Sequence, residues 1–261
     1  MLITLLTDFG TTDTYIGQMK GVIAAIAPEA RVIDLTHHVP PQDITSGAVA
    51  LDSAVDVFPA GTIHVAVVDP GVGSARRPIA ARSDAFLWVG PDNGLFTAAW
   101  KRYPPRHIVA LTEPAYHRPE VSATFHGRDV FAPAAAHLAA GVKLDELGET
   151  IDDPVRLELP EPERTADTVK LRVLTIDHFG NLVTNMTARH LTRYSDLPRA
   201  TVTAGRITAH GVHRTFADVP EHEPVAYIGS SGRLEIAVRN GSAAATAGVH
   251  PGDPVWFFPA R

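Results

Sequence analysis

The chain has 261 residues, enough for one large domain or two modest ones that each bury a core. Hydrophobic residues make up 45% and charged residues 20%, as in ordinary globular proteins, so we expect no extended disorder. The net charge is −6 with no basic run, and there is no cysteine. These features argue against a nucleic-acid partner and exclude disulfide scaffolds, thiolate metal sites and a cysteine nucleophile.

The first half of the chain alternates strand and helix patterns. Continuous apolar runs predict buried strands at residues 2–6, 31–35, 62–68 and 85–90. Apolar stripes with helical spacing predict two amphipathic helices, one through Tyr15, Met19, Val22 and Ile26 and one through Ile44, Ala48, Leu51 and Val55. A third helix is expected from Asp129 to Ala140. This alternation predicts an α/β domain with a central sheet flanked by helices.

The second half of the chain has a different pattern. Residues 152–167 are rich in proline and acidic residues and have no periodicity, which favours a linker. Beyond them, short β-type runs separated by turn residues predict a smaller all-β, barrel-like domain. We therefore expect an N-terminal domain at 1–155, a linker at 156–168 and a C-terminal domain at 169–261.

The N-terminal segment MLITLLTDFG bears on the location of the protein. It has no basic region before its apolar run, and that run is too short to span a bilayer. We therefore expect a cytoplasmic protein without a membrane partner.

Polar clusters follow several predicted strands, where open α/β sheets bind their ligands. Asp8, in TDFGTTD, directly follows the first strand and could accept hydrogen bonds from a ribose diol or simply cap the next helix. Asp69 and Arg76, in VVDPGVGSARR, surround a glycine-rich turn and could form a ligand pocket or an ion pair that fixes the loop. Asp92 and Asn93, in GPDNGLF, are better explained as turn residues.

A further cluster, ATFHGRDVF, places His126 just before the third predicted helix. Histidine at such a position can exchange protons near neutral pH, although a structural role is the commoner one. Asp8, Asp69 and His126 could also form a metal site. No HxH or HExxH spacing supports that alternative, so we expect no metal.

Two clusters in the second half could bind a ligand or be plain hairpin turns. DHFGNLVTN contains Asp177, Phe179 and Asn181, a polar and aromatic group suited to a flat heterocycle. GSSGRLEIAVRNGSAA places Ser230, Ser231 and Asn240 beside small residues that leave backbone amides accessible.

Taken in order, these clusters make the chain resemble the S-adenosylmethionine (SAM) hydroxide adenosyltransferases, also called SAM hydrolases, which are relatives of the bacterial fluorinase and chlorinase. The resemblance runs from TDFGTTD to RNGSAA and covers essentially the whole chain. It implies an N-terminal α/β domain and a C-terminal barrel-like domain. It also implies a homotrimer in which one subunit's N-terminal domain and a neighbour's C-terminal domain form each site.

The resemblance also implies roles for individual residues. Asp8 would hold the ribose hydroxyls and Asp13 the methionine amino group. The pocket would be completed across the interface by Asp177, Phe179 and Asn181 around the nucleoside and methionine, by Ser230 and Ser231 at the methionine carboxylate, and by Arg239, Asn240 and Gly241 at the adenine edge.

The nucleophile distinguishes branches of this superfamily. The halogenases carry Tyr in place of Asp69 and lack His126, whereas Asp69, Arg76 and His126 mark the water-using branch. The segment ARRPIAARSDAFLWVG has no room for the extra loop of the fluorinase. Gln42 replaces a stacking Trp and Tyr15 a Ser, which leaves the methionine pocket undefined.

The resemblance therefore predicts hydrolysis of SAM to adenosine and methionine, with no cofactor and no metal. A sulfonium is already an activated leaving group, so the enzyme needs only to align a water with C5′ and assist loss of its proton. Asp69, Arg76 and His126 would share that task. Two alternatives stay open: a binding protein that senses SAM or adenosine, and a chloride-using halogenase.

Overall fold

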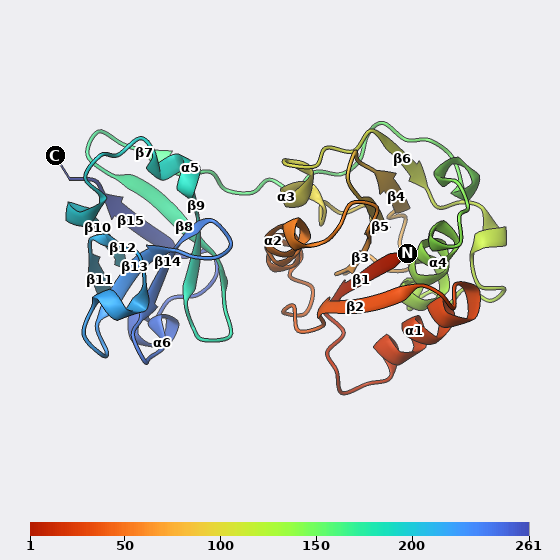
Figure 1. Ribbon diagram of the computed structural model, residues 1–261, viewed down its shortest axis with the longest axis horizontal. Coiled ribbons are helices and arrows are strands. Elements are labelled where there is room, and N and C mark those ends of the chain that lie inside the picture. Colours follow the sequence, from red (N-terminus) through yellow and green to blue (C-terminus); the bar gives the residue numbers. More distant parts are fainter. Residues whose placement is uncertain (261) are drawn as a thin grey trace. The chain divides into compact units, whose positions relative to one another are not determined.

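The computed structural model describes residues 1–260, and the chain divides into two compact units. The first unit spans Met1–Leu157 and the second begins at Glu158. Each has its own hydrophobic core. Figure 1 shows the elements of each unit. No helix within residues 1–260 is both long and apolar enough to cross a membrane.

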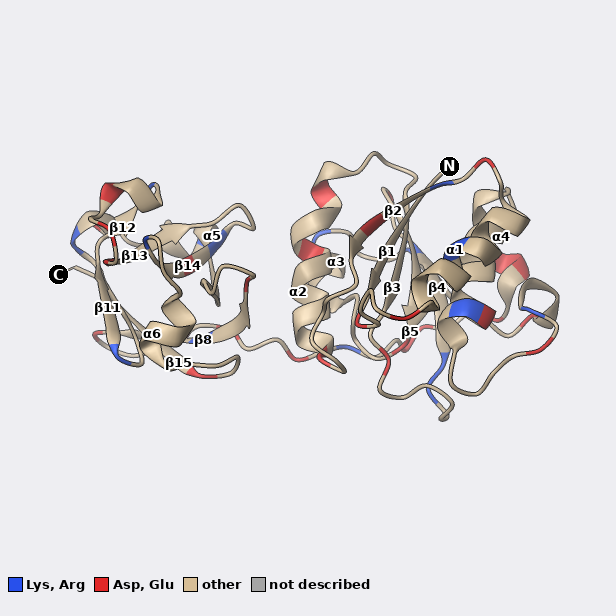
Figure 2. Cartoon of the chain, turned by 90° about the horizontal axis from the view of Figure 1, so that it is seen from below, with Lys and Arg blue, Asp and Glu red and all other residues tan. Residues whose placement is uncertain are grey.

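The first unit is a six-stranded sheet with helices on both faces. Its strands are β1 (Leu2–Thr7), β2 (Arg31–Thr36), β3 (Ile63–Val67), β4 (Pro78–Arg82), β5 (Leu87–Pro91) and β6 (His107–Ala110). Its α-helices are α1 (Tyr15–Ile26), α2 (Ile44–Ala54), α3 (Thr97–Trp100) and α4 (Ala132–Ala139). Helices α1 and α4 cover one face of the sheet, and α2 and α3 cover the other (Figure 2).

The order of the strands brings the predicted polar clusters to one edge of the sheet. The order is β2-β1-β3-β5-β4-β6, and β1 runs parallel to both β2 and β3. Thr7 at the end of β1 pairs with Val67 at the end of β3. The loops that carry Asp8 and Asp69 therefore leave neighbouring strands at the same edge, where ligands of open sheets bind.

The sequence-based description of this unit was correct in outline but incomplete. The predicted α/β architecture is confirmed, and all four predicted strands are present as β1, β2, β3 and β5. Strands β4 and β6 were missed because they are short and not uniformly apolar. The helix expected over 129–140 is a π-helical turn, η3 (Gly127–Phe131), followed by α4.

The second unit is a strongly curved, mostly antiparallel sheet, as predicted. Its strands are β7 (Glu163–Arg164), β8 (Val169–Ile176), β9 (Leu182–Thr187), β10 (Thr201–Ala204), β11 (Ile207–His210), β12 (Val212–His213), β13 (Pro224–Ile228), β14 (Arg233–Val238) and β15 (Pro254–Phe258). The order is β11-β10-β15-β8-β9-β14-β13-β12, and β11 also packs near β13, so the sheet nearly closes on itself. Two short helices, α5 (Ala188–Leu191) and α6 (Ala243–Ala247), accompany it.

Candidate active site

Asp69 and Arg76 form a buried ion pair at the end of β3. The guanidinium donates from Nε to Asp69 Oδ1 at 3.1 Å and from Nη2 to Oδ2 through a short contact. The side chains are only 5% and 7% exposed, so this is a fork-to-fork pair largely removed from water. Arg76 also lies over the ring of Phe131. Its Nη1 atom is buried and has no hydrogen-bond partner within residues 1–260.

His126 joins this pair. Its Nδ1 lies 3.1 Å from Arg76 Nη2, which is a donor, so Nδ1 must accept and the ring proton of the neutral imidazole is on Nε2. Burial lowers the pKa of His126, and the positive charge of Arg76 lowers it further, while Asp69 and Asp129 raise it in part. His126 is therefore held as a neutral imidazole of defined tautomer.

The loops that carry these residues are packed tightly together. Gly73 has a φ of +75°, and a Cβ atom there would collide with the carbonyl oxygen of Ala123, three residues before His126. On the other side, His126 is the N-cap residue of the π-helical turn η3, a feature often found at functional sites. The buried Asp129 in this turn accepts hydrogen bonds from Arg128 and from the amide of Ser122. These contacts fix the segment that presents His126.

Asp8 is fixed by a backbone amide rather than by a side chain. Its Oδ2 accepts a hydrogen bond from the amide of Gln42 at 2.8 Å. Gln42 has a φ of +66°, a left-handed conformation that is unusual for a residue with a side chain. One carboxylate oxygen of Asp8 is thus held in place, and the other is available to a ligand. This role of Gln42 could not be predicted from the sequence, because a backbone donor has no side-chain signature.

A cluster of three aromatic rings connects the loops of Asp8 and His126. Phe9, Tyr15 and Phe125 meet edge to face with centroids 5.1–6.0 Å apart. Tyr15 is 45% exposed, so one side of the cluster faces solvent. Asp13 is also exposed, in the loop just before α1.

Asp92 and Asn93 have structural roles, as their turn-like sequence indicated. The Asp92 carboxylate binds the Arg77 guanidinium and the amide of Val155. Asn93 donates to the carbonyl of Val68 at 2.8 Å and so supports the residue before Asp69. This cluster supports the loop that carries the Asp69–Arg76 pair.

In the second unit, Asp177, Phe179 and Asn181 form one tight turn. Asp177 accepts hydrogen bonds from the amides of Phe179 and Asn181 and from the Asn181 side chain. The Phe179 ring is 75% exposed, an unusual state for a large apolar side chain. The turn packs closely against Ser242, because a Cβ atom at Gly180 would collide with that residue.

The remaining predicted residues lie on two further turns of this unit. Arg239 donates to the carbonyl of Val219 at 2.7 Å, and Asn240 adopts a φ of +56° and donates to Glu221. Gly241 closes that turn by donating to the carbonyl of Val238. Ser230 is exposed, whereas Ser231 is half-buried and donates to the buried Glu235, a residue that the sequence analysis did not select.

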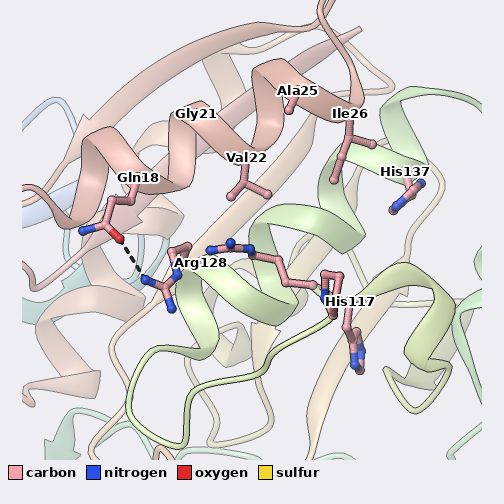
Figure 3. Close-up of a pocket in the computed structure, with 10 residues that line it drawn as sticks. Gln18, Gly21, Val22, Ala25, Ile26, His117, Arg128 and His137 are labelled. Carbon is pink, nitrogen blue, oxygen red and sulfur yellow. Dashed lines mark hydrogen bonds between the residues drawn. The ribbon is translucent and has the colours of Figure 1, made fainter.

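Two other features bear on ligands. Within residues 1–260, no group of three or more His, Asp or Glu side chains is arranged to hold a metal ion. A groove of about 540 Å³ runs along α1 in the first unit (Figure 3). Arg128, at one wall of this groove, donates to Gln18 at 2.9 Å. None of the predicted site residues lines it.

Comparisons with known proteins show the family of the chain. Residues 3–148 match the SAM hydroxide adenosyltransferase N-terminal domain, and residues 171–256 match the C-terminal domain. A Thermus thermophilus protein named (R)-S-adenosyl-L-methionine hydrolase is 45% identical over 258 residues, which is 96% of each chain. The protein of the same name from Salinispora arenicola is 44% identical, covering 96% of this chain and 95% of that one.

More distant relatives include proteins named fluorinase. A protein named fluorinase from Nocardia brasiliensis is 30% identical and covers 90% of this chain and 89% of its own. Among solved structures, an uncharacterized conserved protein from Thermotoga maritima superposes with a TM-score of 0.92 at 33% identity, covering 99% of this chain and all of that one.

Proposed function

Because the chain belongs to the SAM hydroxide adenosyltransferase family, we propose that it hydrolyses SAM to adenosine and methionine. The observation that carries this proposal is the buried Asp69–Arg76 pair joined to His126 at the carboxyl edge of the sheet, next to Asp8. The two named hydrolases that are 44–45% identical support it.

The reaction is a displacement at C5′. The oxygen of water forms a bond to C5′, the C5′–S bond breaks, and its electron pair neutralises the sulfonium, so that one proton is released in total. The leaving group is a neutral thioether, so the enzyme has to supply alignment and a route for the proton. We infer that no metal and no cofactor take part.

The geometry favours one division of labour among the three residues. Arg76 has only donors, and neutral His126 presents its Nε2 proton while Nδ1 accepts from Arg76. Asp69 alone has free acceptor lone pairs, so it takes the proton of the attacking water. Arg76, through its unpartnered Nη1, and His126 act as donors that stabilise the negative charge that develops on the oxygen.

The binding residues follow the resemblance. Asp8, fixed by Gln42, holds the ribose diol, and Asp13 and the half-exposed Tyr15 lie on the methionine side. The exposed Phe179 stacks on the nucleoside, with Asp177 and Asn181 beside it. The turns at Ser230–Ser231 and Arg239–Gly241 complete the pocket.

We further propose that the protein is a cytoplasmic homotrimer. The resemblance supports a site shared between one subunit's N-terminal domain and a neighbour's C-terminal domain. The exposure of Phe179 is in keeping with a contact that an isolated chain does not make.

The names of the relatives specify the sulfonium configuration. They are called hydrolases of (R)-S-adenosyl-L-methionine, the epimer inverted at sulfur. We propose the same preference here. A turnover assay with separated epimers tests it: we expect kcat/KM at least tenfold higher for the R epimer, and equal values would contradict it.

Incubation of the pure protein with SAM, followed by product identification, tests the function itself. We expect stoichiometric adenosine and methionine, unchanged by EDTA and by chloride. Bound SAM without turnover would favour the sensor alternative. Chloride-dependent 5′-chloro-5′-deoxyadenosine would favour a halogenase, and loss of activity in EDTA would indicate a metal.

A further inference from the structure

The groove along α1 has the size of a binding site, and the mechanism above does not use it. Its volume of about 540 Å³ lies within the range of small-molecule sites. Part of its lining is apolar and consists of Val22, Ala25, Ile26 and Pro119. Figure 3 shows Val22 and Ile26 pointing from α1 toward the opposite wall. An apolar body can therefore be buried against this helix.

The rest of the lining is basic. Arg118 and Arg128 line the groove together with His117 and His137, and no acidic side chain within residues 1–260 is among the lining residues. A guanidinium binds carboxylate or phosphate oxygens through paired N–H donors. The groove thus joins an apolar surface to positive charge, a combination that suits an organic anion.

The buried carboxylate of Asp129 uses only part of the donor capacity of the two arginines. Arg128 donates to its two oxygens from Nε and Nη2, at 2.6 and 2.9 Å, and to Gln18 from Nη1. Arg118 makes one long contact with it, 3.4 Å between Nη1 and Oδ1. One carboxylate therefore faces two guanidiniums. Arg118, whose side chain is 42% exposed, keeps most of its donors for a ligand.

His117 provides a second indication of a ligand. Its Nε2 atom is buried and has no hydrogen-bond partner within residues 1–260. Burial and the charge of His126 lower the pKa of His117, while the Leu111 backbone and the exposed Glu113 raise it only in part. Glu113 thus does not neutralise this side of the groove. A polar ligand would give the imidazole a partner that the chain does not provide.

We propose that this groove binds a small organic anion, with the anionic group at Arg118 and Arg128 and an apolar body along α1. This site is separate from Asp69, Arg76 and His126, none of which lines the groove, and it goes beyond the proposed function. A terminal carboxylate and a phosphate ester both match a guanidinium, so the ligand class is defined by its negative charge and its apolar part.

Isothermal titration calorimetry of the whole protein with hexanoate, hexyl phosphate and uncharged hexanamide tests the proposal. We expect at least one of the two anions to bind about tenfold more tightly than hexanamide. The tighter of the two identifies the anionic group as carboxylate or phosphate. Acetate and inorganic phosphate, which lack the apolar part, should bind about tenfold more weakly than the matching hexyl compound. Equal affinity for all three hexyl compounds, or no binding of either anion, would overturn the proposal.

Gly21→Leu tests the location of the site. Gly21 lines the groove within α1, and no atom lies within 4 Å of its Cβ position, so leucine can fill the groove without a collision. The anions should bind about tenfold more weakly to this variant. Gly17→Leu is the matched control, because Gly17 has equally open surroundings in α1 but does not line the groove. Its affinity should equal that of wild type.

Arg118→Gln tests the charge. Asp129 keeps its contacts with Arg128 and with the amide of Ser122, so we expect this variant to fold. The anions should bind about tenfold more weakly and hexanamide as in wild type. The control Arg199→Gln, at an arginine whose side chain is 81% exposed in the second unit, should change neither. Wild-type affinity for the anions in either lining variant would overturn the proposal. These titrations follow binding and not turnover, so they are independent of whether the protein hydrolyses SAM.

Discussion

Arg76 Nη2 donates to Nδ1 of His126 at 3.1 Å, and this contact determines where the imidazole proton lies. With Nδ1 engaged, the only ring proton of the neutral form is on Nε2. The same guanidinium binds both oxygens of Asp69. One arginine thus determines the tautomer of the histidine and the orientation of the carboxylate.

The first prediction concerns pH. Burial and the charge of Arg76 lower the pKa of His126 below 6.5. The neutral imidazole that the mechanism uses therefore persists as the pH falls to 6.5, and it is lost only at lower pH. We expect kcat to stay constant down to pH 6.5 and to decline at lower pH. The pH profile of kcat for wild type and for His126→Gln measures this. A decline that begins above pH 6.5 in wild type alone would show that His126 is an ordinary general base.

The second prediction concerns the division of labour. Asp69→Asn keeps the shape of the side chain but removes the proton acceptor, so kcat should fall by about 10²–10⁴-fold while KM changes by only a few-fold. His126→Ala removes one donor and should cost less. Steady-state kinetics with SAM measure both. A larger loss in His126→Ala than in Asp69→Asn would reverse the proposed roles.

These roles show what the sequence could and could not predict. The continuous apolar runs of β1 and β3 placed Asp8 and Asp69 at strand ends, and the parallel pairing of those strands made them neighbours. The amide clamp from Gln42 was not predictable, because it depends on a backbone conformation. Glu235 was missed because RLEIAV has the alternation of an ordinary half-buried strand, although its glutamate is buried.

The third prediction tests the shared site. Asp69→Asn damages only the first unit and Phe179→Ala only the second. In a trimer with sites between subunits, each site takes its first unit from one chain and its second unit from a neighbour. When the two variants assemble in equal amounts, both units are intact in about one quarter of the sites. Coexpression of the two variants should therefore restore about a quarter of wild-type activity. Activity equal to the mean of the two separate variants would place each site within one chain.

The fourth prediction concerns the packing beneath His126. Gly73→Ala introduces both a left-handed alanine and a collision with the Ala123 carbonyl. Gly141→Ala is the matched control, since Gly141 has a φ of +100° and no atom near its Cβ position. We expect the control to lose about 1–2 kcal/mol of unfolding free energy with kcat retained. Gly73→Ala should lose more and also lower kcat, as chemical denaturation and kinetics would show. Equal effects on kcat would mean that the 73–123 contact does not position His126.

The last prediction concerns stability and involves a residue far from catalysis. His64 in β3 is fully buried, with Nδ1 2.8 Å from the Thr4 hydroxyl, and burial lowers its pKa to about 4. Protonation therefore favours the unfolded chain. The stability that neutral His64 provides is complete above pH 6.5 and is lost as the pH falls toward 4, by about 3 kcal/mol. Urea unfolding measures this: between pH 6.5 and 4, the free energy of unfolding of His64→Gln should fall by up to about 3 kcal/mol less than that of wild type. The control His250→Gln, at an exposed histidine, should match wild type. Parallel curves for wild type and His64→Gln would mean that His64 titrates normally in the folded protein.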